Sequence, residues 1–118
     1  MFIACGKNDK SINLDRNLSG SELSDSYCIK MVRDYWDCSK GAFYNNQYST
    51  GNYYRRNYSC QGDDRGDLMS LIDFLFNDER IVIDRSKCYY RNYILYIEAH
   101  KSNTNPLSYD DHYLTVTF

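Results

Sequence analysis

Apolar residues recur every fourth position across residues 23–35, and this spacing predicts a helix with one buried stripe. Ser19 and Glu22 stand three residues apart in front of the stripe, which is the spacing of a capping box. We therefore expect a helix over about residues 22–38. Trp36 lies near its end, and a tryptophan on such a stripe is expected to pack in the core.

A second helix is expected over residues 67–76, where four apolar residues follow helical spacing. Asp67 precedes the first of them and is the predicted N-cap, because a short acidic side chain accepts a hydrogen bond from a free amide of the first turn. Asn77 is expected to close the helix.

Most of the remaining chain has the alternation and the β-branched or aromatic content of strands. Between these segments, Asn45-Asn46 and Thr50-Gly51-Asn52 are predicted to form turns, and residues 103–106 are predicted to form a loop that joins the last two strands into an antiparallel hairpin. The strands are expected over residues 2–5, 53–60, 79–84, 88–99 and 112–118.

Together these elements predict one compact α+β domain over residues 1–118, an antiparallel sheet with two helices packed on one face. A chain of 118 residues is long enough to bury a single core. The hydrophobic content of 42%, the charged content of 25% and the single proline are those of an ordinary folded domain.

The compositional outlier is tyrosine, with 13 residues, and its distribution gives the first functional signal. Residues 39–60 hold six aromatic and three basic residues but no acidic one, whereas residues 63–84 hold seven acidic residues. Tyrosine and arginine are enriched where proteins contact partners, since they combine large contact area with hydrogen-bonding groups.

We therefore interpret this strip as a contact face with an acidic flank, and we predict no cofactor and no metal site. The predicted contact residues are Tyr44, Tyr48, Tyr53, Tyr54, Arg55, Arg56 and Tyr58, and the flank is Asp63, Asp64 and Asp67.

A small domain without a catalytic set resembles phage-encoded inhibitors of bacterial defence, including anti-CRISPR proteins, in size and type. This resemblance implies a non-enzymatic protein-binding inhibitor in the cytoplasm of a host cell. The expected partner is a protein, although the basic and aromatic strip could also take a nucleic acid. The net charge of −2 does not provide the dominant positive face that duplex binding normally needs.

The five cysteines support an alternative. The segment 2–6 around Cys5 resembles the end of a bacterial lipobox, which implies a periplasmic lipoprotein anchored at Cys5, such as an immunity protein that blocks a toxin. The other four cysteines could then form two disulfides. No charged and apolar leader precedes Cys5, so we favour the intracellular interpretation, with the cysteines mostly buried as small apolar residues. The four cysteines that could form disulfides are Cys28, Cys38, Cys60 and Cys88.

Two histidines support a third interpretation. His100 and His112 each lie near an acidic residue, and on neighbouring strands they could share an acid-base site. The chain resembles fungal guanyl-specific ribonucleases in composition and in its helix-then-sheet order, which implies RNA cleavage. No histidine occurs between residues 42 and 78, where that family's catalytic motif would fall, so we expect a protein that is not an enzyme.

Overall fold

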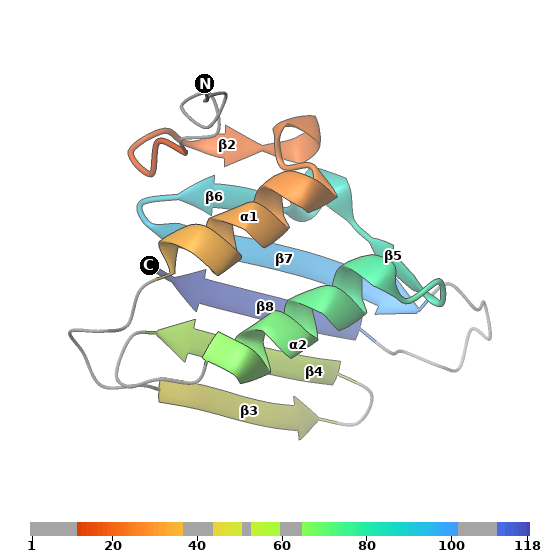
Figure 1. Ribbon diagram of the computed structural model, residues 1–118. Helices are drawn as coiled ribbons and strands as arrows, with labels where there is room; N and C mark the ends of the chain where they lie inside the picture. Colours follow the sequence, from red (N-terminus) through yellow and green to blue (C-terminus); the bar gives the residue numbers. More distant parts are fainter. Residues whose placement is uncertain (1–11, 37–43, 51–52, 60–64, 102–110) are drawn as a thin grey trace, which may run out of the picture.

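The computed structural model describes residues 12–36, 44–50, 53–59, 65–101 and 111–118, with residues 44–50 and 53 described by their backbone alone. These residues form one seven-stranded sheet with two helices on one of its faces (Figure 1). The predicted α+β class, with both helices on one face, is confirmed. The elements in chain order are β2 (Leu18–Ser19), η2 (Gly20–Glu22), α1 (Asp25–Tyr35), β3 (Tyr44–Thr50), β4 (Tyr53–Ser59), α2 (Arg65–Asn77), β5 (Ile81–Ile83), η3 (Arg85–Lys87), β6 (Tyr89–Arg91), β7 (Ile94–Lys101) and β8 (Asp111–Thr117).

The strands lie in the order β2-β6-β7-β8-β4-β3, and β5 also pairs with β7. All neighbours are antiparallel except β4 and β8, which run parallel with Tyr58 opposite Val116. The predicted antiparallel pairing of the last two strands is confirmed, with Ile97 opposite Leu114. The sheet is therefore mostly antiparallel, and the parallel pair arises because β8 enters between β7 and β4.

The core lies between the sheet and the two helices. Alternate residues of β7 and β8, such as Leu95 and Leu114, are buried beneath the helices, as period-two alternation requires. Trp36 follows α1 and is fully buried, as predicted, and its indole Nε1 donates a hydrogen bond to the carbonyl oxygen of Thr117 (3.0 Å). This bond ties the end of α1 to the end of β8.

Helix α1 begins three residues later and ends three residues earlier than predicted. The carboxylate of Glu22 accepts a hydrogen bond from the Ser19 amide (3.2 Å), as the capping box requires, but this arrangement caps the short turn η2. The N-cap of α1 is Ser24, whose hydroxyl accepts from the Tyr27 amide (3.2 Å). Two capping signals thus follow each other, and the sequence pattern identified the first.

Helix α2 begins at Arg65, so Asp67 lies inside the first turn instead of at the predicted N-cap. Its carboxylate accepts a hydrogen bond from the Tyr58 hydroxyl of β4. The pattern predicted that the Asp67 carboxylate accepts from an amide of the first turn, whereas it accepts here from a side chain of the neighbouring strand. The helix ends at Asn77, as predicted.

The predicted strand over residues 88–99 is wrong, because it is two strands joined by a tight turn. Arg91 pairs with Ile94, and the two residues between them have positive φ angles, 53° at Asn92 and 65° at Tyr93. Two left-handed residues in succession define the type I′ turn that suits a two-residue hairpin. The tyrosine hydroxyl donates a hydrogen bond to Asp15, which holds the turn against the N-terminal loop.

The predicted turn at Asn45-Asn46 is also wrong. Both residues lie within β3, where Asn46 pairs with Asn57 of β4. Strand β3 continues to Thr50, which pairs with Tyr53 of β4. Gly51 and Asn52 of the other predicted turn lie outside the described residues. The strand predicted at residues 2–5 and the loop at residues 103–106 lie outside the described residues.

Neither α1 nor α2 is long and apolar enough to cross a membrane, and no other helix occurs in the described ranges that could do so.

Candidate functional site

Strand β4 carries most of the predicted contact residues, and its alternation sends them to both faces of the sheet. Tyr54 and Tyr58 lie on the helix side, opposite His112 and Val116 of β8. Arg55 lies on the other side, where its guanidinium carbon is 4.2 Å from the centroid of the Tyr113 ring. The prediction of one continuous contact face is therefore corrected, because a strand cannot present consecutive residues on one side.

Tyr58 belongs to the core. Its ring is 1% exposed and meets the Trp36 ring edge-on, with 6.3 Å between centroids. Burial and the hydrogen bond to Asp67 raise the pKa of the phenol well above its usual range. A ring at this depth offers no area to a partner, so the contact surface does not include Tyr58, and Asp67 serves as its hydrogen-bond acceptor.

Tyr54 and Arg56 lie beside helix α2. The Tyr54 ring is 38% exposed and stacks on His112, with centroids 5.2 Å apart and planes inclined by 17°. Arg56 is half-buried, and both residues line a pocket against α2. They are accessible, but on the opposite face from Arg55.

For three other predicted contact residues the structure gives the strand pairing of the backbone alone. Tyr48 pairs with Arg55 in the register of β3 and β4, and Tyr44 pairs with Ser59. Tyr53 pairs with Asp111 of β8. The predicted acidic flank residues Asp63 and Asp64 lie outside the described residues.

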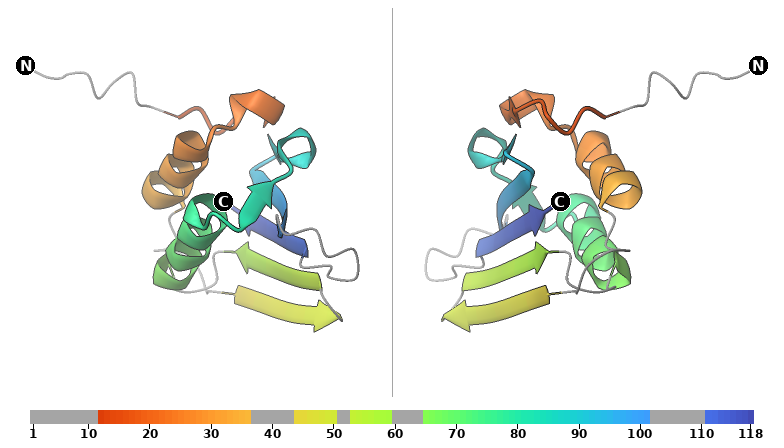
Figure 2. Two further views of the ribbon diagram at one scale, coloured as in Figure 1. Left: turned by 90° about the vertical axis from the view of Figure 1, so that its right-hand side faces the viewer. Right: turned by 90° about the vertical axis from the view of Figure 1, so that its left-hand side faces the viewer.

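The face of the sheet opposite the helices has a tyrosine and arginine cluster of its own, and Figure 2 shows both helices on the other side of the strands. Arg91 lies over the Tyr89 ring at 4.2 Å, and Tyr89 stacks on Tyr96 with centroids 5.2 Å apart and planes inclined by 28°. Arg55 lies over Tyr113 further along the sheet. We call this surface the open face, defined by Arg55, Tyr89, Arg91, Tyr96, Glu98 and Tyr113.

The open face also carries one carboxylate, and this group is paired. The Tyr96 hydroxyl donates to Glu98 (2.7 Å), and the Lys87 ammonium lies 3.4 Å from the same carboxylate. Desolvation and this hydrogen bond raise the pKa of Tyr96, while Glu98 raises the pKa of Lys87. A surface in which cations alternate with rings and a paired carboxylate suits a protein partner better than a polyanion.

Sequence reasoning missed this surface because its members come from four strands and no short window contains them. The signal was nevertheless present in β7, where Leu95, Ile97 and Ala99 alternate with Tyr96, Glu98 and His100. This alternation separates a buried face from one that carries polar and aromatic groups.

The two histidines do not meet. Ala99 is the residue opposite His112, so His100 and His112 project from neighbouring strands on opposite faces. His112 contacts the Phe74 ring of α2, whereas His100 Nδ1 lies 3.0 Å from Asp84 Oδ2. A shared acid-base centre would require both imidazoles on one side of the sheet.

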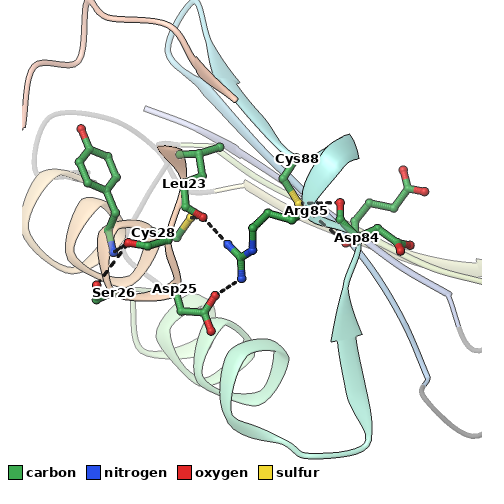
Figure 3. Close-up of polar contacts among 10 residues, drawn as sticks. Leu23, Asp25, Ser26, Cys28, Asp84, Arg85 and Cys88 are labelled. Carbon is green, nitrogen blue, oxygen red and sulfur yellow. Dashed lines mark hydrogen bonds and ion pairs between the residues drawn. The ribbon is translucent and has the colours of Figure 1, made fainter. Parts of the chain in front are cut away.

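Cys28 and Cys88 are buried free thiols near Arg85 (Figure 3). Arg85 extends to the start of α1, where its guanidinium donates to the carbonyl of Leu23, just before the helix, and forms an ion pair with Asp25 in its first turn. Burial raises the pKa of Cys28 to about 12 and also raises that of Cys88. Neither sulfur is in one of the two disulfides that would fit the periplasmic interpretation, and the other cysteines lie outside the described residues.

These pKa values predict slow thiol chemistry. At pH 8 both thiols are neutral and shielded, so we expect iodoacetamide to leave Cys28 and Cys88 unmodified in the folded protein and to modify both in denaturant. Peptide mass mapping after a timed reaction measures this, with the unfolded protein as the reference for full reaction. Rapid native labelling at either position would contradict the buried placement.

Within the described ranges, no three histidine, cysteine or acidic side chains gather as a metal site would require. Comparison of the chain with known protein families, curated protein sequences and solved structures finds no match.

Proposed function

We propose that this chain is a non-enzymatic protein-binding inhibitor that contacts its target through the open face of the sheet. The observation that supports this best is the pair of arginines stacked on tyrosine rings, Arg55 on Tyr113 and Arg91 on Tyr89. Tyrosine and arginine are the residue types that most often dominate interface energies. On this face they occur together without a covering helix among the described residues.

Stacking also lowers the cost of binding. An arginine in solution loses side-chain freedom when it is fixed in an interface, whereas one already held over a ring has lost much of it beforehand. The Tyr89 and Tyr96 rings likewise support each other and lie half-buried. The open face is therefore partly preorganised for contact.

Inhibition is the simplest activity for such a domain, since occupying a functional surface of the target requires no chemistry from the binder. We favour the form of this proposal in which the chain acts in the cytoplasm of a host cell and its target belongs to a bacterial defence system. The periplasmic alternative would fit two disulfides among the four other cysteines, and two of these four, Cys28 and Cys88, are free thiols. The ribonuclease alternative needs the two histidines together, and they lie on opposite faces.

The test first uses the tagged full chain to capture a protein from extracts of the host cell. The captured protein is then purified and titrated with the chain. Replacing Arg55 and Arg91 together by alanine is expected to weaken the affinity about 10- to 30-fold, because both stacked contacts are lost. Both side chains are exposed, so the melting temperature should stay nearly unchanged.

The matched control replaces Arg16 and Arg33 by alanine, two exposed arginines outside the sheet. This variant should bind like the unmodified chain. If the control and the open-face variant bind equally well, the open face is not the contact surface. If the captured partner is a nucleic acid, the proposed class of partner is wrong.

A further inference from the structure

A groove runs between helix α2 and strands β4 and β8, on the face opposite the proposed protein contact. Its larger compartment has a volume of about 380 Å³, which falls in the size range of small-ligand pockets. Leu71, Leu75 and Leu114 form part of its wall. An adjoining compartment of about 210 Å³ lies toward β5 and the end of β7.

Three aromatic rings line both compartments. His112 stacks on Tyr54 and meets Phe74 edge-on, with 5.7 Å between the His112 and Phe74 centroids. Phe74 and Tyr54 are 36% and 38% exposed, among the few large apolar side chains of the described residues with so much accessible area. A planar ring could stack against these exposed edges and faces and cover apolar area that is now in water.

The larger compartment also has polar groups that suit a heteroaromatic ring. Arg56 can donate hydrogen bonds, Asp67 can accept them, and the Ser70 hydroxyl can do either. Arg56 and Asp67 both interact with the Tyr58 hydroxyl, which fixes their positions on the wall. The edge of a nucleobase carries donors and acceptors that match these groups, whereas a hydrocarbon ring has none.

The smaller compartment has two cationic side chains in its wall. Arg80 and Lys101 line it, and no acidic residue of the described ranges does. Two hydrogen bonds to Asp78 hold the Arg80 guanidinium in place, at 2.8 and 3.0 Å. Two cations beside an aromatic pocket match a ligand that joins a planar ring to an anionic group.

We propose that this groove binds a mononucleotide, with the base against Tyr54, Phe74 and His112 and the phosphate near Arg80 and Lys101. The two compartments share their aromatic residues, so the base and the phosphate of one small molecule could occupy both. The site is separate from the open face, and a ligand in it leaves that surface accessible.

The test uses calorimetric titration of the full chain with AMP, GMP, CMP and UMP, with the corresponding nucleosides and with inorganic phosphate. We expect at least one monophosphate to bind with a Kd of about 1 mM or lower, and its nucleoside about 10-fold more weakly. The Lys101→Ala variant should weaken the monophosphate about 10-fold and leave the nucleoside unchanged, whereas Phe74→Ala should weaken both.

The Arg33→Ala variant, at an exposed arginine of α1 away from the groove, is the control and should bind as the unmodified chain does. Circular dichroism confirms that each variant is folded. Absence of saturable binding by all four monophosphates would overturn the proposal. Phosphate binding as tight as that of the nucleotide would overturn it as well, since the aromatic compartment would then contribute nothing.

Discussion

Replacing Trp36 by alanine lowers the free energy of unfolding by about 3–5 kcal/mol, the usual cost of removing a large aromatic side chain from a core. The indole is fully buried between the helices and the sheet, and it contacts Tyr58 edge-on. Its Nε1 also donates to Thr117, so the substitution leaves a cavity and a carbonyl without its donor. For a domain of this size such a loss approaches the whole stability.

Denaturant unfolding followed by circular dichroism measures this effect. Trp36→Phe is the matched control: it retains a ring and most of the contact with Tyr58 but lacks the donor, so it should cost clearly less than alanine. A loss below about 1 kcal/mol for Trp36→Ala would show that the ring is not the central contact between α1 and the sheet.

The stability of the protein is expected to fall steeply above pH 10. Burial raises the pKa of Tyr90 to about 12, and burial together with hydrogen bonds to Asp67 and Glu98 raises the pKa values of Tyr58 and Tyr96 further. Below pH 10 these phenols are protonated in both the folded and the unfolded chain, so their contribution is fully present. Above it the unfolded chain releases protons that the folded one retains.

Each phenol then lowers the free energy of unfolding by about 1.4 kcal/mol per pH unit, which makes roughly 4 kcal/mol per pH unit for the three, until the folded pKa values are reached. The buried thiols of Cys28 and Cys88 act with the same sign and begin nearer pH 9. Denaturation curves at successive pH values measure the slope, and phenolate absorbance reports when the tyrosines ionise.

Tyr96→Phe tests the assignment of this slope. The variant lacks one of the three titrating groups, so the fall in stability between pH 10 and 12 should become shallower by about 1.4 kcal/mol per unit. An unchanged slope would mean that Tyr96 ionises in the folded protein as an exposed phenol does.

The sequence predicted the helices and the fold class because apolar spacing reflects burial directly. It predicted boundaries less well where two local signals compete. The capping box at Ser19 is real but belongs to a short turn, and Ser24 is the cap of the helix itself. The turn at Asn92 and Tyr93 was missed because tyrosine is unusual in the left-handed region, and only the paired strands and the bond to Asp15 explain its place there.

The candidate surface was predicted only in part. Composition pointed to tyrosine and arginine, which are also residue types of the open face, but the strip around Arg55 was treated as one face although strand alternation divides it. The open face combines this arginine with Tyr89, Tyr96 and Tyr113, and their proximity depends on the strand order. Strand order is set by long-range packing, which a pattern of single residues does not encode.

The position of β8 has a consequence for how the molecule assembles. This strand follows the other described strands in the sequence, and it pairs with β7 on one side and with β4 on the other. Until it has left the ribosome, the hairpin of β3 and β4 has no neighbour in the sheet to join, and the two halves of the sheet expose unpaired edges. The sheet therefore completes its folding after the synthesis of β8. A nascent chain stopped before Asp111 would hold two unjoined parts of the sheet, and their unpaired strand edges would favour aggregation.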